Sequence, residues 1–335
     1  MTRRVLITGG AGFIGHHLVD FLLRNTDWQL TLLDRLNHSG NLHRITDLHS
    51  YMSNKHRVVF IYHDLRAEFS DMHTKQIGSH DYVLHLAAAT HVDSSIADPL
   101  SFVIENVVGT CNLLNFVRRT GCEKMIYFST DEVFGPCAPG AAFSEWDRYR
   151  SGNPYAATKA GAEELCLAFH NTYGVPVAIT HCMNVFGERQ HPEKFIPSTV
   201  HKVMNGEKVI IHANKTLTKA GSRFYIHAQS VAEAVHFLLT RRFVPGDKYN
   251  IVGDQEIDNL TLAKAIALYC GRSLIYEMVD FHSSRPGHDL RYALDGSKLA
   301  GMGWTPSATT AERLQDVVDW ISANPFWSPV REAVA

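Results

Sequence analysis

The 335-residue sequence carries little net charge and no long hydrophobic run. Lysine and arginine number 32 against 34 aspartates and glutamates, so the net charge is −2 with neutral histidines. A nearly neutral chain has no general attraction for nucleic acid or for anionic membranes. No apolar stretch reaches the ~18 residues of a membrane span, and the apolar run behind Arg3 and Arg4 meets Gly9 too early for a signal peptide. We therefore expect a cytoplasmic protein whose partners include neither nucleic acid nor membrane.

Cysteine and histidine motifs are absent as well. The six cysteines (residues 111, 122, 137, 166, 182 and 270) form no CxxC pair, and none of the 20 histidines stands in an HExxH or comparable spacing. These absences predict reduced thiols and no bound metal. The sequence also contains no internal repeat and no low-complexity tract. With 45% apolar and 20% charged residues, it can build a sizeable core of one or two domains.

A glycine-rich turn follows the first expected strand. The apolar run at residues 5–8 leads into Gly9-Gly10-Ala11-Gly12-Phe13-Ile14-Gly15, and apolar residues then continue at helical spacing. Glycines permit a tight turn and a close approach of the backbone to a pyrophosphate, and the helix N-terminus supplies N–H donors. A second expected strand, at residues 30–33, ends in Asp34, which stands 19 residues after Gly15. Because an acid near this distance binds the adenosine ribose, the pattern predicts a dinucleotide site.

The residues after the second strand bear on the choice between NAD and NADP. The Asp34 carboxylate can accept hydrogen bonds from a ribose 2′-OH but repels a 2′-phosphate. Arg35 is the counter-evidence, because a guanidinium there could pair with that phosphate. Asp34 stands directly at the strand end, so the sequence favours NAD.

Strands and helices continue to alternate along the first half of the chain. Further strands are expected at residues 57–62, 81–86, 125–128 and 175–180, with a long amphipathic helix at 99–119. This alternation predicts an α/β fold with a Rossmann-type doubly wound parallel sheet over residues 1–183, to which 221–245 return. Residues 184–335 are expected to form mainly a smaller α/β lobe, which would leave a ligand cleft between the two parts. The elements expected after residue 187 are a strand at 209–212 and helices at 195–205, 230–240, 260–269 and 310–323.

Two polar groups stand where chemistry is expected. Ser129-Thr130-Asp131-Glu132 follows the strand at 125–128, and ligands bind outside the carboxyl ends of parallel strands. Asn153 and Pro154 suit the start of a helix, on which Tyr155 and Lys159 share one face. An ammonium beside a phenol favours the phenolate, so the tyrosine could accept a proton. Each group also has a plain structural reading, as a turn cluster and as an ordinary helical pair.

Together these features resemble the extended short-chain dehydrogenase/reductase superfamily, and within it the nucleotide-sugar 4,6-dehydratases of the dTDP-glucose 4,6-dehydratase type. The resemblance covers nearly the whole chain, and the Asp131-Glu132 pair separates it from the epimerases and decarboxylases of the superfamily. The matching motifs are Thr8–Gly15, Asp34-x-Leu36, Gly40-Asn41-Leu42, His85-Leu86-Ala87-Ala88, His91-Val92-Asp93, Ser129–Gly135, Pro192–Pro197 and Arg285–Asp289.

The resemblance implies a reaction and a role for each catalytic residue. The protein would convert a dTDP- or UDP-glucose-like substrate to the 4-keto-6-deoxy sugar by C4 oxidation, loss of water across C5–C6 and return of the hydride from NADH to C6. Tyr155 would take the 4-OH proton, and Lys159 would hold the nicotinamide ribose and lower the tyrosine pKa. Thr130 would bond the 4-OH, Asp131 would protonate the departing 6-OH, and Glu132 would remove the C5 proton. A homodimer is implied in the same way.

The resemblance also implies two sets of binding residues. The cofactor set is Gly9, Gly12, Phe13, Ile14, Gly15, Asp34, Arg35, Leu36, Asn37, Gly40, Asp64, Leu65, Leu86, Ala87, Ala88, Tyr155 and Lys159. The substrate set is Thr90, Asn184, Glu193, Lys194, Phe195, Ile211, His212, Arg223, Asn250, Arg285 and His288. Cationic and amide groups in the second set suit a diphosphate.

Departures from the family pattern affect the substrate side only. Val185-Phe186 replaces Asn-Tyr, Ala89-Thr90 replaces Glu-Ser, Ile210-Ile211-His212 replaces Pro-Ile-Tyr, and residues 226–229 lack the usual acids. These changes leave the nucleobase and the hexose open.

Two alternatives share the scaffold. A C4-epimerase or 5,6-dehydratase would keep Tyr155 and Lys159 without needing both Asp131 and Glu132. A nucleotide-sugar-binding protein without turnover would need none of these four residues, so their presence favours an enzyme.

Overall fold

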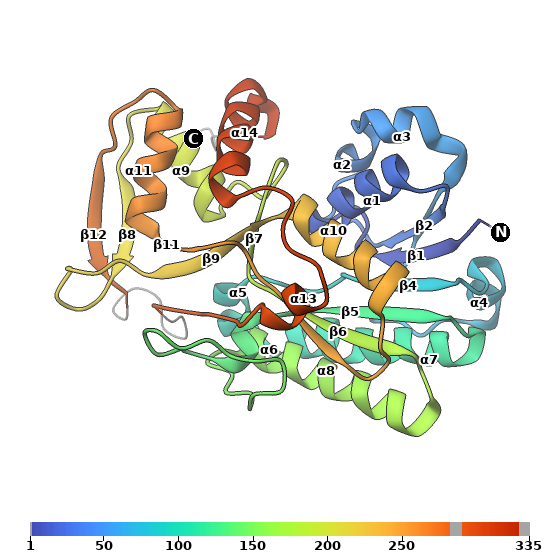
Figure 1. Ribbon diagram of the computed structural model, residues 1–335. Coiled ribbons are helices and arrows are strands. Elements are labelled where there is room, and N and C mark those ends of the chain that lie inside the picture. The colour runs from blue at the N-terminus through green and yellow to red at the C-terminus, as the bar shows by residue number, and fades with distance from the viewer. Residues whose placement is uncertain (1, 282–289, 328–335) are drawn as a thin grey trace.

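The computed structural model describes residues 2–281 and 290–327 (Figure 1). Seven parallel strands form the main sheet, in the order β10-β6-β5-β4-β1-β2-β3. The strands are β1 (Arg4–Thr8), β2 (Gln29–Asp34), β3 (Val58–Tyr62), β4 (Tyr82–His85), β5 (Lys124–Thr130), β6 (Val177–Cys182) and β10 (Lys248–Ile251). The order reverses between β1 and β4, and ligands bind at such a reversal in open α/β sheets. The predicted Rossmann-type doubly wound sheet is therefore confirmed.

Both faces of the main sheet are buried, which explains the continuous apolar runs of its strands. Successive residues of β1 point to opposite faces: Val5 and Ile7 pack beneath α1 and α10, and Leu6 packs beneath α7 and α8. The first-lobe helices are α1 (Phe13–Asn25), α2 (His43–Thr46), α3 (His49–Asn54), α4 (Asp71–Ile77), α5 (Val92–Ala97), α6 (Pro99–Phe102), α7 (Gly109–Thr120), α8 (Pro154–Tyr173) and α10 (Ala228–Phe237).

The helix expected at 99–119 contains a wider turn. Between α6 and α7, residues Val103–Val108 form the π-helical segment η2. By length and composition alone, Pro99–Thr120 could cross a membrane, but half of its most apolar stretch is buried within the protein. Core helices of globular proteins have this same character.

The second lobe lies beside the carboxyl ends of the main strands, on the left of Figure 1. A three-stranded sheet joins β7 (Asn184–Phe186), β9 (Ser222–His227) and β11 (Glu256–Asp258), and β8 (Val209–Ala213) pairs with β12 (Tyr276–Asp280). Helices α9 (Phe195–Met204), α11 (Asn259–Tyr269) and α14 (Thr310–Ala323) enclose a core of their own. The strand and helices expected at 195–205, 209–212, 260–269 and 310–323 are thus present.

The segment that returns to the first lobe differs from the predicted one. It spans α10 to β10, residues 228–251, whereas the sequence predicted 221–245. The difference arises because β9 pairs with β7 and β11 in the small sheet, while β10 pairs with β6 at the edge of the main sheet. The short helix α13 (Ser297–Gly301) also packs against β10.

Candidate active site

The glycine turn lies between β1 and α1, against the end of β4. Gly9 has φ +71°, and a Cβ there would stand 2.8 Å from the nitrogen of Ala87. A Cβ on Gly15 would stand 2.2 Å from the carbonyl oxygen of Gly9. Only glycine fits either position, so the turn brings backbone close to the carboxyl edge of the sheet. Phe13 and Ile14 are the first residues of α1. Leu86, Ala87 and Ala88 directly follow β4.

Asp34 stands at the end of β2, as predicted for an adenosine-ribose acid. One carboxylate oxygen accepts from the Ala11 nitrogen at 3.1 Å, and the other accepts from the Leu36 nitrogen at 2.9 Å. Leu36 has φ +52°, and a Cβ on Gly40 would stand 2.9 Å from Asp34 Oδ1. Asp34 therefore holds the glycine turn and the loop at residues 36–40 together at the adenosine end of the predicted dinucleotide site.

Arg35 is held by two carboxylates. Its guanidinium lies 2.7 Å from Glu105 Oε1 and 3.4 Å from Asp64 Oδ2. Although burial raises the pKa of Asp64, hydrogen bonds from Arg66 and the charge of Arg35 hold that pKa at about 2. The positive charge of Arg35 is thus balanced within the protein, so Arg35 is less suited to bind the 2′-phosphate of NADP. Asp34, which repels such a phosphate, favours NAD.

The side chains after β5 form a compact acidic group. The Thr130 hydroxyl donates to Asp131 Oδ1 at 3.0 Å and accepts from the Glu132 nitrogen at 3.4 Å. Asp131 is 6% exposed, and its Oδ2 has no hydrogen-bond partner among residues 2–281 and 290–327. Burial, and next the charge of Glu132, raise the pKa of Asp131 to about 7. A carboxyl group that is partly protonated at neutral pH therefore stands beside Glu132, whose Oε2 accepts from Asn153 Nδ2 at 2.9 Å.

The start of α8 brings Tyr155 and Lys159 to the same edge. Asn153 caps the helix by accepting from the Ala156 nitrogen at 2.8 Å, and Pro154 occupies the first turn. Tyr155 is 8% exposed. The Lys159 ammonium donates to the Phe128 carbonyl at 2.6 Å, one strand residue before Ser129.

The effect that the resemblance assigns to Lys159 on the pKa of Tyr155 stays a prediction. Burial, and next the charge of Glu132, raise the pKa of Tyr155 well above its usual value, while the Thr130 hydroxyl opposes this rise. Lys159 is turned toward the carbonyl of Phe128, and burial lowers its own pKa to about 8.

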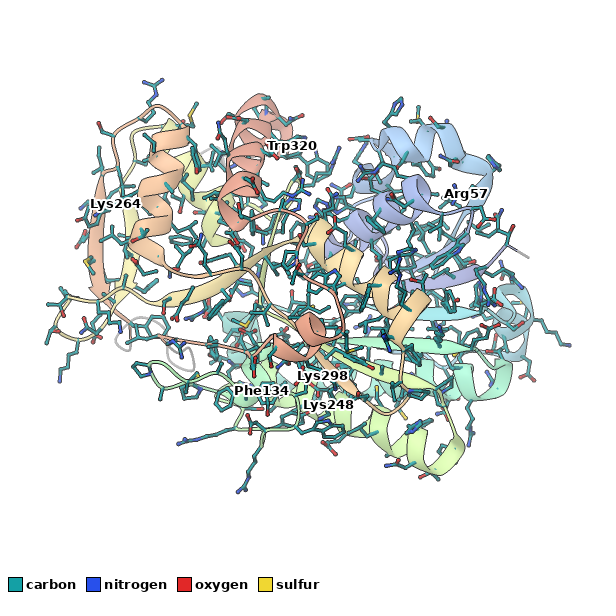
Figure 2. The ribbon with its side chains drawn as sticks, in the orientation of Figure 1. Arg57, Phe134, Lys248, Lys264, Lys298 and Trp320 are labelled. Carbon is teal, nitrogen blue, oxygen red and sulfur yellow. The ribbon has the colours of Figure 1, made fainter. Side chains whose placement is uncertain are left out.

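A buried polar network lies behind this acidic group. Glu163 is fully buried on α8, one turn after Lys159, and its carboxylate accepts from the hydroxyls of Ser129 and Tyr149. His181 Nε2 lies 3.1 Å from Glu163 Oε2, and the Lys248 ammonium (Figure 2) lies 3.7 Å from the same oxygen. Burial raises the pKa of Glu163, but the bonds to its partners lower it below the usual value, so the group is ionised.

Asn106, in the π-helical segment η2, holds the loop after β4. Its Oδ1 accepts from the Ala89 nitrogen at 2.8 Å, and its Nδ2 donates to the Ala89 carbonyl at 3.1 Å and to Thr158 Oγ1 at 3.0 Å. It thus fixes this loop to α8. The sequence analysis did not identify Asn106 or Glu163. Each is a polar residue on the apolar face of a long helix, and this pattern could have indicated a buried polar contact.

From the second lobe, Arg223 reaches the catalytic end of β5. Its Nη1 donates to the carbonyls of Ser222 and Leu290, each at 2.7 Å, and its Cζ lies 4.5 Å from the ring centroid of Tyr292. Its charge lowers the pKa of Asp131, opposing the larger effect of burial. A cation of the second lobe therefore stands near the predicted acid.

Several other predicted substrate residues are at least partly accessible to solvent. Asn184 and Thr90 are exposed, and Glu193 Oε2 lies 3.8 Å from His91 Nε2 of the first lobe. Lys194, Phe195 and His212, in the second lobe, are half-buried. Arg285 and His288 lie outside the described residues.

Two substrate predictions do not fit the structure. Asn250 is fully buried, with its Oδ1 on His181 and its Nδ2 on the carbonyls of Phe143 and Asp295, so it has no group to offer a diphosphate. Ile211 is also fully buried, in the core beneath β8. Both strands are covered by segments distant in sequence, which the local pattern does not reveal.

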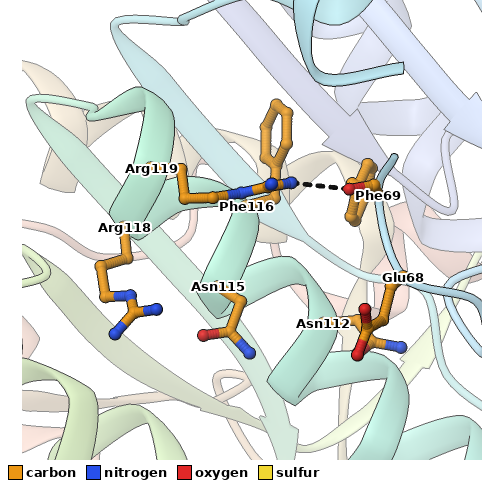
Figure 3. Close-up of a pocket in the computed structure, with 7 residues that line it drawn as sticks. All are labelled: Glu68, Phe69, Asn112, Asn115, Phe116, Arg118 and Arg119. Carbon is orange, nitrogen blue, oxygen red and sulfur yellow. Dashed lines mark hydrogen bonds between the residues drawn. The ribbon is translucent and has the colours of Figure 1, made fainter. Parts of the chain in front are cut away.

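A separate depression lies beside α7 (Figure 3). It is lined by Glu68, Phe69, Asn112, Asn115, Phe116, Arg118 and Arg119. Arg119 closes one side by donating to the Phe69 carbonyl at 2.7 Å. None of these residues belongs to the predicted sites.

The buried network predicts a large stability effect at Glu163. Glu163→Gln would leave Lys248 and His181 buried without their anion, and we expect it to cost about 3–5 kcal/mol of unfolding free energy. The exposed neighbour Glu164 provides the control, since Glu164→Gln should change stability by about 0.5 kcal/mol or less. Urea unfolding measures both, and equal midpoints for the two variants would contradict the network's role.

Comparisons with known proteins agree with this geometry. Residues 6–317 match the family model described as GDP-mannose 4,6 dehydratase. The dTDP-glucose 4,6-dehydratase of Streptomyces niveus is 36% identical, with 98% of this chain and 96% of the relative covered. The Escherichia coli dTDP-glucose 4,6-dehydratase is 32% identical, with 97% and 95% covered. The crystal structure of the Streptomyces venezuelae dTDP-glucose 4,6-dehydratase with NAD bound superposes with a TM-score of 0.88 at 32% identity, covering 97% of this chain and 99% of that one. The chain therefore belongs to the nucleotide-sugar 4,6-dehydratases, a family of hydro-lyases.

Proposed function

We propose that the protein uses NAD to dehydrate a nucleoside-diphosphate hexose of the dTDP- or UDP-glucose type to its 4-keto-6-deoxy sugar. One observation carries this proposal: a buried carboxyl group with a raised pKa, Asp131, stands beside Glu132 at the strand end that also faces Tyr155. Elimination of water needs an acid and a base at the same time, and two carboxyl groups with separated pKa values provide them.

The first step is oxidation at C4. When bound, NAD accepts the hydride from C4, later returns it to C6, and brings a positively charged nicotinamide ring that favours the Tyr155 phenolate. Tyr155 takes the proton of the 4-OH, and the Thr130 hydroxyl, its hydrogen-bond partner, orients that oxygen. The Lys159 ammonium donates to the Phe128 carbonyl beside the catalytic strand end. From this position Lys159 would hold the nicotinamide ribose.

The second step is loss of water across C5 and C6. The C4 ketone acidifies the C5 proton, which Glu132 removes while Asp131 gives its proton to the departing 6-hydroxyl. Because its pKa is raised to about 7, a substantial share of Asp131 is still protonated at neutral pH, as this role requires. Arg223, near Asp131, is suited to hold a substrate phosphate. An epimerase would not need this acid–base pair, and a protein that only binds nucleotide sugars would not need Tyr155.

Isotope transfer in heavy water tests the reaction. We expect a 4-keto-6-deoxy product with deuterium at C5 and the original C4 hydrogen at C6, as read by mass spectrometry and NMR. Glu132→Gln should lower dehydration by a factor of about 10²–10⁴, the usual scale for losing a general base, while bound NAD is still reduced.

Two outcomes of that experiment would reject the assignment. A product without solvent deuterium at C5 would exclude elimination through a C5 anion. A C4 epimer that retains its 6-hydroxyl would instead identify the epimerase alternative.

Asp131 predicts a specific pH dependence. Because the acid acts only when protonated, dehydration should decline as the pH rises through about 7. Asp131→Asn should remove this decline together with most of the dehydration, and reduction of bound NAD should persist. Initial rates of keto-sugar formation across the neutral range measure the effect, and an unchanged pH profile in the variant would assign the acid to another group.

We also propose a homodimer through the helix spanning residues 99–120. Leu100, Val103, Ile104 and Val108 expose between 37% and 66% of their area on this helix, an apolar row that suits a second copy of the chain. Light scattering should give twice the chain mass for the wild type and a single chain mass for Leu100→Glu. Met72→Glu, at a 71% exposed apolar position on α4, serves as the control and should remain dimeric. A monomeric wild type would reject this proposal.

A further inference from the structure

Arg44, on the short helix α2, connects three backbone segments. It is 5% exposed, and its Nη1 donates to the carbonyls of Ala11, at 3.3 Å, and Ser39, at 2.5 Å. Ala11 belongs to the glycine turn, and Ser39 belongs to the loop that Asp34 holds. Its Nε donates to the carbonyl of Arg189 at 3.1 Å, in the segment that enters the second lobe after β7. One side chain thus joins both walls of the adenosine end to the second lobe.

The segment at residues 187–189 is pressed against the dinucleotide helix α1. A Cβ on Gly187 would stand 2.9 Å from His17 Nε2, and the carbonyl oxygen of Glu188 lies 3.1 Å from the same nitrogen. Arg189 adopts φ +59°, a left-handed conformation that is uncommon outside glycine. Such a conformation persists where the surroundings hold it, and here the surroundings are α1, α2 and the C-terminal part of the chain.

Two tryptophans complete the contact from the C-terminal side. Arg189 Cζ lies 5.1 Å from the ring centroid of Trp320 on α14, labelled in Figure 2, and 5.9 Å from that of Trp327 in the 3-10 turn η5 (Pro325–Trp327). Arg44 Cζ lies 5.8 Å from the Trp327 centroid. Burial lowers the pKa of Arg44 to about 10, so its guanidinium stays charged at neutral pH and both arginines can make cation–π contacts.

We propose that Arg44, Arg189 and Trp327 form a clasp by which the second lobe retains the dinucleotide through the catalytic cycle. The inference rests on the proposed function, because a hydride removed from C4 and returned to C6 requires that the reduced cofactor stay bound. The clasp ties the second lobe to the adenosine end, where the glycine turn and the ribose loop meet, and so leaves the nicotinamide end free for substrate. Arg44 is a positioning residue in this arrangement, because it acts on the backbone that surrounds the cofactor.

The dissociation rate of NAD from the holoenzyme tests the clasp. Protein loaded with radiolabelled NAD is mixed with excess unlabelled NAD, and the label that remains bound is followed with time. Arg44→Lys loses the forked geometry that reaches three carbonyls, and we expect it to release NAD at least about tenfold faster than the wild type. Trp327→Ala, at a half-buried position, should accelerate release by about threefold, the scale of an exposed cation–π contact.

Arg57 provides a matched control. It is 8% exposed and its guanidinium also donates to three backbone carbonyls, those of Leu23, Thr26 and Trp28, at the far end of α1. Arg57→Lys should destabilise the fold to a comparable degree, as urea unfolding will show, and leave NAD release unchanged.

The outcomes separate the clasp from the proposed function. A wild type that holds NAD, with Arg44→Lys and Trp327→Ala releasing it no faster than Arg57→Lys, would overturn the clasp and leave the proposed function intact. If Arg44→Lys does not fold, the NAD release rate of Trp327→Ala, compared with that of Arg57→Lys, tests the clasp by itself. A wild type that binds no NAD would overturn both.

Discussion

The grip of α8 on the end of β5 is the interaction on which the active site depends. Lys159 binds the carbonyl of Phe128, and one helical turn later Glu163 accepts from the hydroxyl of Ser129. Two consecutive strand residues are thus held by two charged side chains on one helix face. The strand then delivers Thr130 and its acidic neighbours directly beside Tyr155.

The grip is built from charges that water does not reach. Glu163 is fully buried, and Lys159 and Lys248 are 4% and 3% exposed. Buried charges contribute little net stability when paired, but removal of one partner is costly, so such a set specifies one geometry. The same burial determines the chemistry, because it raises the pKa of Asp131 to about 7 and keeps that group available as an acid.

The second lobe serves the two ends of the cofactor site differently. Arg223 stands near Asp131 at the catalytic end. Arg189 is bound to Arg44 and packed on Trp320 at the adenosine end, where the lobes are joined. An adenosine end at which the two lobes are joined suits an enzyme that exchanges its sugar and keeps its dinucleotide.

The sequence by itself determined the main sheet and the positions of its glycine turn, strand-end acid and helix cap, because these depend on local signals. Glycine tolerance between β1 and α1, the acid at the end of β2 and the cap at Asn153 each act within a few residues along the chain. Strand and helix periodicity likewise gave the main sheet, since parallel strands buried on both faces are continuously apolar.

Only the tertiary structure decided which polar groups are free to act. Asn250 resembled a ligand for phosphate in the sequence, yet residues 143 and 295 cover it and use its amide. Lys159 donates to a strand carbonyl, and burial raises the pKa of Tyr155 in the packed chain. The network around Glu163 and the contact between Arg44 and Arg189 join residues far apart in the chain. Burial, charge pairing and lobe contact are properties of the packed chain, so no local pattern could have revealed them.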